Sequence, residues 1–305
     1  MFDGGAVDTS PLKKPKMDPG DPEWKSLRIS NGDLWVADTL DPEKGITYPA
    51  SSGDAPFTRI PRKAALEMTG MLHKEESNRY CTALNYGYKS QRGSLHRGKS
   101  KRIYSDFKYC NMGAQACRAG RGVREYSYHR DSMPEEQWDF IVEMMQRTED
   151  ALASFVTSDV LGQINHARSL LQFKTMAPAS AGHLQPNKIF SGIAFGKNVH
   201  LSCHTDQDYT VSITSVHLHG HQYGLHDRIV AYFCFPRLGV AVALRPGDVL
   251  VFNPSEPHAI SSRCHADDNL LCVSMYLKTA IVGLNDNSIC LTASQEKLKN
   301  EWRHE

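Results

Sequence analysis

The chain has 305 residues, of which 23% are charged and 40% hydrophobic, and its formal net charge is +1. A net charge this small does not by itself indicate a nucleic-acid or membrane partner, and evidence for such a partner must come from a local charged patch. No stretch of about 18 consecutive apolar residues occurs, and no apolar segment follows the early positive charges. The eight cysteines form no Cys-x-x-Cys pair. We therefore expect an intracellular protein, in the nucleus or cytoplasm, with reduced thiols.

Composition and periodicity divide the chain into four regions. Residues 1–30 are rich in Pro, Gly, Asp and Lys without an apolar period, and we expect a disordered tail. Residues 31–183 alternate short apolar pieces with long polar stretches, and we expect a mixed, mainly helical support region. Residues 184–285 form the expected core, and 286–305 a C-terminal helix or tail.

A helix is predicted to begin at Ser132-Met133-Pro134-Glu135, which has the form of a capping box with proline early in the first turn. The apolar residues that follow recur at threes, fours and sevens, which predicts one face packed on the rest of the protein. They are Trp138, Ile141, Met145, Leu152 and Phe155. A second helix is predicted from Val160 to Leu171.

After Pro186 the apolar period changes from 3.6 to 2, and short strands alternate with turn signals such as Arg245-Pro246-Gly247-Asp248. Eight such strands predict a jelly roll or double-stranded β-helix, and the fold class is then α+β with N-terminal supporting helices. The expected strands are 188–195, 198–202, 209–218, 228–235, 239–244, 248–252, 258–262 and 269–277.

A metal site is predicted at His204, Asp206 and His258. His204 and Asp206 follow the second strand, and residues two apart in extended backbone point the same way. His258 begins the seventh strand, which neighbours the second in a double-stranded β-helix. Two imidazoles and one carboxylate on one face leave coordination positions open, the arrangement of non-haem Fe(II) oxygenases. A lone His-x-Asp is a weak signal, and a barrel that binds no metal is the alternative.

A row of imidazoles at His217, His219 and His221 is a second candidate metal site of cupin type. No carboxylate follows it at the matching spacing, so we interpret the row as a solvated hairpin tip. Cys203 adjoins the first ligand, but neighbouring residues in a strand face opposite ways, which favours outward packing over a redox role.

Residues 188–285 resemble the core of iron(II)/2-oxoglutarate-dependent oxygenases. The segments SCHTDQDYT, AYFCFPRLGVAVALRPGDVLVFNPSEPHAISSRC and CVSMYLKTAIVGLNDNS look most like oxygenase-like proteins encoded by algal genomes. Those proteins are distantly similar to the Tet and base-J thymidine hydroxylase group. The resemblance implies Fe(II) on His204, Asp206 and His258, and 2-oxoglutarate as co-substrate.

The sequence departs from that family at Cys272-Val273-Ser274, where the family usually has Arg, followed two positions later by Ser, to bind the distal carboxylate of 2-oxoglutarate. Ser274 matches, but Cys272 replaces the cation. A buried carboxylate needs a cationic or well hydrogen-bonded partner. We expect Arg263 to substitute, with Lys278 as a further candidate. The alternative is a different reductant, such as ascorbate.

A basic loop at 89–102 is the candidate contact for nucleic acid, because it contains no acidic residue. A merely solvated loop is the alternative. Its basic residues are Lys89, Arg92, Arg97, Lys99, Lys101 and Arg102. The leading hypothesis is an Fe(II)-dependent, 2-oxoglutarate-using dioxygenase that hydroxylates a C–H bond, first of a nucleic-acid base and second of a protein side chain. A non-catalytic binding module is the competing class.

Overall fold

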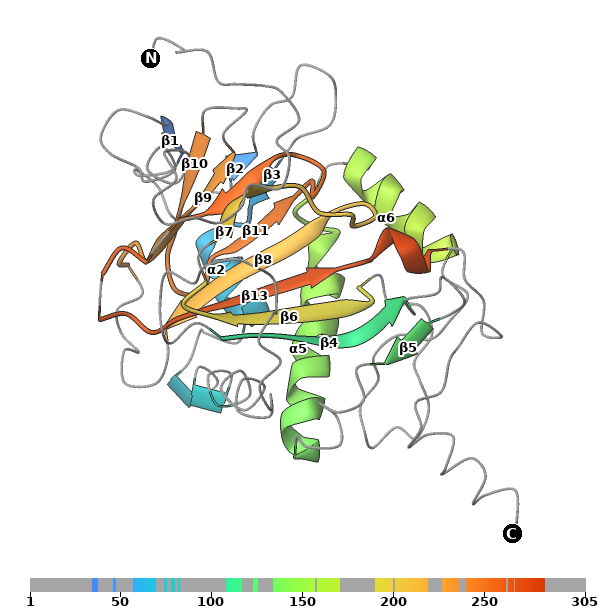
Figure 1. Cartoon of the computed structure of the whole chain (residues 1–305), viewed down its shortest axis with the longest axis horizontal. Helices are drawn as coiled ribbons and strands as arrows, with labels where there is room; N and C mark the ends of the chain where they lie inside the picture. The colour runs from blue at the N-terminus through green and yellow to red at the C-terminus, as the bar shows by residue number, and fades with distance from the viewer. Residues whose placement is uncertain are drawn as a thin grey trace.

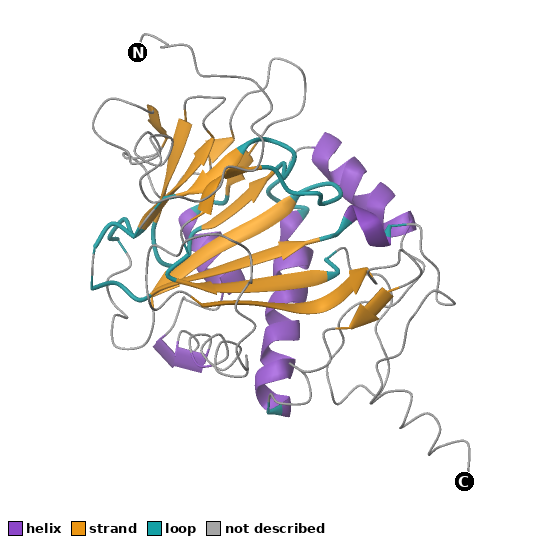
Figure 2. Ribbon diagram, viewed as in Figure 1, coloured by secondary structure: helices purple, strands orange, loops and turns teal. Residues whose placement is uncertain are grey.

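The architecture comes from a computed structural model, in which two sheets pack face to face and helices cover the outer face of the larger one (Figures 1 and 2). None of the described helices is long and apolar enough to cross a membrane. The structure describes residues 35–37, 46–47, 57–69, 74–75, 78–79, 82, 108–116, 123–125, 134–156, 158–170, 190–199, 201–218, 227–235, 240–261, 263–265 and 267–282.

All eight strands expected after Pro186 are present, with bounds shifted by a few residues. They are β6 (Gly192–Lys197), β7 (Leu201–His204), β8 (Ser212–Leu218), β9 (Ala231–Phe235), β10 (Val240–Leu244), β11 (Val249–Phe252), β12 (His258–Ile260) and β13 (Leu270–Tyr276). They divide between the sheets as β11-β8-β13-β6 and β10-β9-β12-β7, with antiparallel pairing throughout. The second and seventh strands, β7 and β12, are therefore neighbours as predicted.

Strands from the N-terminal half extend both sheets. The five-stranded sheet gains β1, which pairs in parallel with β10, and the eight-stranded sheet gains β2 and β3 at one edge and β4 and β5 at the other. The bounds are β1 (Trp35–Ala37), β2 (Ile46–Thr47), β3 (Phe57–Arg59), β4 (Lys108–Ala116) and β5 (Val123–Glu125). The support region thus shares its sheets with the core.

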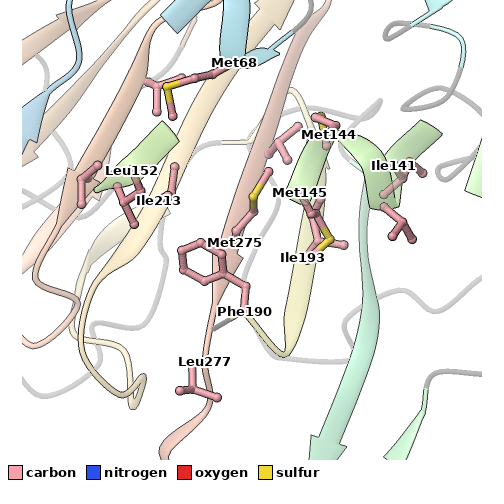
Figure 3. Packing of buried hydrophobic residues seen from close by; sticks show 14 of the residues in the cluster. Met68, Ile141, Met144, Met145, Leu152, Phe190, Ile193, Ile213, Met275 and Leu277 are labelled. Carbon is pink, nitrogen blue, oxygen red and sulfur yellow. The ribbon is translucent and has the colours of Figure 1, made fainter. Parts of the chain in front are cut away.

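Helix α5 (Glu135–Leu152) lies across the outer face of the larger sheet, beside α2 (Arg62–Thr69) and α6 (Ser158–Leu170). Trp138 and Ile141 are fully buried in the cluster between this helix and the sheet, which confirms the predicted apolar stripe. Met144, Met145, Ile193 and Met275 lie in the same layer (Figure 3). The helix begins at Glu135 with Pro134 as its N-cap, and Ser132 lies outside the described residues.

A second core fills the space between the two sheets. It joins Phe57, Val216, Leu250 and Phe252 of the larger sheet to residues of the smaller one, among them Phe233 and Phe235. The rings of Phe57 and Phe235 stack with centroids 4.7 Å apart. Because alternate residues of each strand point into this space, a polar group on the same face lies inside the sandwich.

Candidate metal centre

The two histidines of the predicted triad face each other across neighbouring strands. His204 ends β7 and pairs directly with His258, the first residue of β12. Asp206 follows two residues after His204, and its Oδ2 lies 3.7 Å from Nε2 of His204 and 3.5 Å from Nε2 of His258. The ligand atoms of all three residues lie within 4.8 Å of one another.

A tight turn fixes the two ligand segments relative to each other. The backbone N–H of Glu256 donates to the Asn253 carbonyl at 3.1 Å, and that of Ser255 donates to the Asn253 side chain at 2.9 Å. Both bonds are typical of an Asx-type turn. The N–H of Asp206 donates to the carbonyl of Pro254 at 2.9 Å, so the turn that precedes His258 also holds the Asp206 backbone.

The donor set fits a divalent metal ion. Nδ1 of His258 lies 2.8 Å from the Glu256 carbonyl oxygen, so Nδ1 carries a proton. A bound metal ion would displace the proton that Nε2 shares with Asp206 and take up the Nε2 lone pair. Nitrogen and oxygen ligands lie about 2.0–2.2 Å from such an ion, which places cis ligands about 3 Å apart. The observed separations of 3.5 and 3.7 Å need only a small contraction. Two imidazoles and one carboxylate suit iron(II).

Exposure changes steadily across the triad. The side chain of His258 is 4% exposed, that of His204 17% and that of Asp206 38%. Phe233 stacks on the His258 ring at 5.4 Å between centroids, and Phe252 meets it edge-on at 4.8 Å. The centre therefore has an apolar floor beneath His258 and opens to solvent beside Asp206.

Charges beside the site keep Asp206 ionised. Partial burial alone would raise the pKa of its carboxyl, but a hydrogen bond with His258 and the charges of His204, His258 and Lys278 together lower the pKa to about 2. Lys278 itself forms an ion pair with Asp208, and its ammonium lies 4.5 Å from the centre of the Tyr276 ring. An ionised carboxylate is the form that binds metal.

The residues expected to bind 2-oxoglutarate lie in different places. Lys278 lies beside the triad, paired with Asp208. Ser274, in the middle of β13, has its hydroxyl 3.2 Å from that of Thr214. Arg263 follows β12 and donates to the backbone carbonyl of Asp268 at 2.6 Å. Their roles stay predictions, and the structure does not bring the three side chains together in one cluster.

The remaining histidine and cysteine interpretations have mixed outcomes. His217 is fully buried on β8, with Nε2 3.0 Å from the Ser215 hydroxyl, so the hairpin-tip interpretation is wrong for this residue. His219 and His221 lie outside the described residues, as do residues 1–30, 89–102 and 286–305. Cys203 packs with Cys234 in a small separate cluster, in agreement with the expected outward packing.

Comparisons with known proteins show a shared fold. No protein-family model matches the chain, and no curated protein matches it in sequence. The solved structure of NgTET1 in complex with 5mC DNA is similar over 92% of this chain and 95% of its own, with 12% identity and a TM-score of 0.50. A 2OG-Fe(II) oxygenase family protein from Burkholderia pseudomallei is similar over 75% of this chain and 88% of its own, with 11% identity and a TM-score of 0.42.

Proposed function

We propose that this chain is an Fe(II)-dependent, 2-oxoglutarate-using dioxygenase that hydroxylates a C–H bond. The convergence of two imidazoles and one carboxylate within 4.8 Å carries this proposal. With iron bound, dioxygen and 2-oxoglutarate would yield carbon dioxide, succinate and a substrate that has gained one oxygen atom. The likeness of the fold to NgTET1 in complex with 5mC DNA supports the same class, because the Tet group belongs to the family that residues 188–285 resemble.

The strand arrangement supports a double-stranded β-helix as the scaffold. Consecutive core strands alternate between the two sheets except for β9 and β10, which are paired in one sheet. The first, third, sixth and eighth strands of the core thus lie in one sheet and the remaining four in the other. This alternation brings the segment after β7 and the start of β12 to one end of the sandwich. It sets His204 and His258 on rigid strands, with Asp206 two residues past the end of β7.

The protein's own part in the reaction follows from the surroundings of each ligand. The Glu256 carbonyl and the ring of Phe233 hold the His258 imidazole in one orientation and tautomer. The apolar floor formed with Phe252 excludes water from that side. A substrate would then approach from the exposed side, beside Asp206, whose side chain is the most exposed of the three.

A base in nucleic acid is the substrate class we favour, because the NgTET1 structure contains 5mC DNA. The six basic residues between Lys89 and Arg102 supply the charge that a phosphate backbone requires. Replacing them together by alanine should weaken binding of single- and double-stranded oligonucleotides and flatten the dependence of affinity on salt. A protein side chain is the second substrate class.

The experiment that tests the function supplies purified, iron-loaded protein with 2-oxoglutarate under air. We expect 2-oxoglutarate to be converted to succinate and a 5-methylcytosine oligonucleotide to gain one oxygen in its mass. His258→Ala should abolish both, whereas His166→Ala, which removes an exposed histidine of α6, should change neither. Iron bound stoichiometrically without turnover of 2-oxoglutarate would favour the non-catalytic binding module.

A further inference from the structure

The interior face of β13 carries Cys272, not a cation, at the position where the resembled oxygenase family has arginine. Cys272 is buried in the core between the sheets, and burial raises the pKa of its thiol to about 12. It is therefore neutral. 2-Oxoglutarate carries a second carboxylate at the end remote from its keto acid group, and burying that charge requires a cation supplied by another element.

Arg59, on β3 at the edge of the larger sheet, projects into the space between the sheets. It is two residues from Phe57, whose ring stacks on Phe235 of the opposite sheet, and so it shares that interior face. Its pairing partner on β11 is Leu250, a member of the same core. Although it is an arginine, Arg59 is only 1% exposed.

The strand register places Arg59 at the right depth below the metal ligands. The ring of Phe252 contacts that of His258, and Leu250, the partner of Arg59, lies two residues from Phe252 along β11. At about 3.3 Å per residue, Arg59 therefore lies about 6.6 Å further along the strand direction than Phe252. The same level continues across the sheet from Leu250 through Thr214 to Ser274. Of the seven residues of β13, Ser274 alone is not fully buried, which shows that solvent reaches this level.

Several buried charged groups lie around Arg59. Three guanidinium groups gather here, since the charges of Arg62 and Arg245 act on Arg59, and Asp248 is the one acid among the described groups that does so. All four residues are at most 7% exposed. One oxygen of Asp248 lies 2.5 Å from Nη1 of Arg62, and the other accepts the backbone N–H of Arg245 at 2.7 Å. A ligand carboxylate placed beside Arg59 would therefore enter a region rich in buried guanidinium groups.

We infer that Arg59 binds the distal carboxylate of 2-oxoglutarate, in place of the cation missing at Cys272. This assignment rests on the proposed function. Ser274, level with Arg59 and partly exposed, carries the hydroxyl that would share the carboxylate. The backbones of β3 and β13 are three strand spacings apart, about 14 Å, a gap that an arginine side chain, a carboxylate and a serine hydroxyl span together.

The test measures ligand binding by calorimetry on full-length protein loaded with Mn(II), so that no turnover is needed. 2-Oxoglutarate is compared with 2-oxovalerate, which keeps the keto acid but lacks the distal carboxylate. Arg59→Met should bind Mn(II) with the parent's stoichiometry and lose about 10- to 100-fold in affinity for 2-oxoglutarate, the range for a charge-assisted bond. Its affinity for 2-oxovalerate should stay unchanged. Arg147→Met, on the exposed face of α5, is the matched control and should alter neither.

Further variants keep the assignment testable if Arg59→Met misfolds, and they distinguish failure of the Arg59 assignment from failure of the proposed function. If Arg59→Met does not fold, Arg59→Lys retains the charge and should bind 2-oxoglutarate between the parent and the expected loss, again with 2-oxovalerate unaffected. Equal losses for both ligands, or no loss for 2-oxoglutarate, would overturn the assignment. A selective loss in Arg263→Ala or Lys278→Ala, with Arg59 variants unaffected, would also overturn it. If the parent binds Mn(II) but no 2-oxoglutarate, the proposed function itself fails.

Discussion

His204 and His258 lie directly opposite each other on β7 and β12, with ring centroids 4.5 Å apart. The two residues are brought together by strand pairing alone, since they belong to segments far apart in the sequence. A shift of one residue in this register would turn one imidazole to the other face of the sheet. The pairing of these two strands is therefore the feature on which the candidate metal centre depends.

Removal of any one ligand should abolish iron binding. We expect His204→Ala, Asp206→Ala and His258→Ala each to reduce bound iron from one per chain to near zero, because two remaining ligands hold an iron(II) ion weakly. Far-ultraviolet circular dichroism should remain that of the parent. Iron is measured by a colorimetric chelator after gel filtration, with His166→Ala as control. Stoichiometric iron retained by His258→Ala would contradict the assignment.

Trp138 should be one of the largest single contributors to stability outside the site. Its side chain is 1% exposed in the cluster between α5 and the larger sheet. Trp138→Ala should lower the free energy of unfolding by about 3–5 kcal/mol, because the loss of buried apolar area leaves a cavity. Urea titration measures the change. Glu143 lies on the exposed face of the same helix, and Glu143→Ala should lower the free energy of unfolding by less than about 1 kcal/mol. Similar values for both variants would refute the packing argument.

The core strands and the triad were predictable because both have local signals. Alternating apolar residues marked each of the eight strands, and His204 with Asp206 showed a spacing of two just after one of them. The prediction of His258 as the third ligand required one non-local inference, namely that the second and seventh strands of the fold are neighbours. The structure has this pairing, so a fold-level expectation was enough to connect distant residues.

Arg59 was not predictable in the same way. β3 has only three residues, too few to show a period, and β4 carries a largely polar sequence that resembles a loop. Whether Arg59 faces the interior depends on its register with Leu250 of β11, far along the chain. Phe233 and Phe252 were also missed as neighbours of His258, although strand alternation placed both on interior faces. These contacts are set by tertiary packing, which leaves no local pattern.

His217 should make stability depend on pH. Burial, with the charge of Arg62, lowers the pKa of this imidazole to about 3. The pKa of a histidine in the unfolded chain is about 6.5, so below that pH the unfolded chain binds a proton at His217 that the folded chain does not bind. The free energy of unfolding should fall as the pH drops from about 6.5 towards 3, by up to about 1.4 kcal/mol per pH unit. Urea titrations between about pH 4.5 and 7.5 should show that the free energy of unfolding depends less steeply on pH in His217→Gln than in the parent. The exposed His166→Gln should match the parent, and an equal slope for His217→Gln would contradict the buried, neutral state.

Asp248 should contribute strongly to stability because it lies among several buried cations. It is 2% exposed, accepts from Arg62 and caps the backbone N–H of Arg245 in the turn before β11. Asp248→Asn keeps the shape but removes the charge, and we expect a loss of about 3–5 kcal/mol, as for a buried pair that loses one partner. Thermal melting in the presence and absence of 2-oxoglutarate gives the sharper comparison. If a ligand carboxylate takes up positive charge beside Arg59, 2-oxoglutarate should raise the melting temperature of metal-loaded Asp248→Asn more than that of the parent. Equal shifts in melting temperature for the parent and Asp248→Asn would show that Asp248 does not act on the ligand site and contributes only to stability.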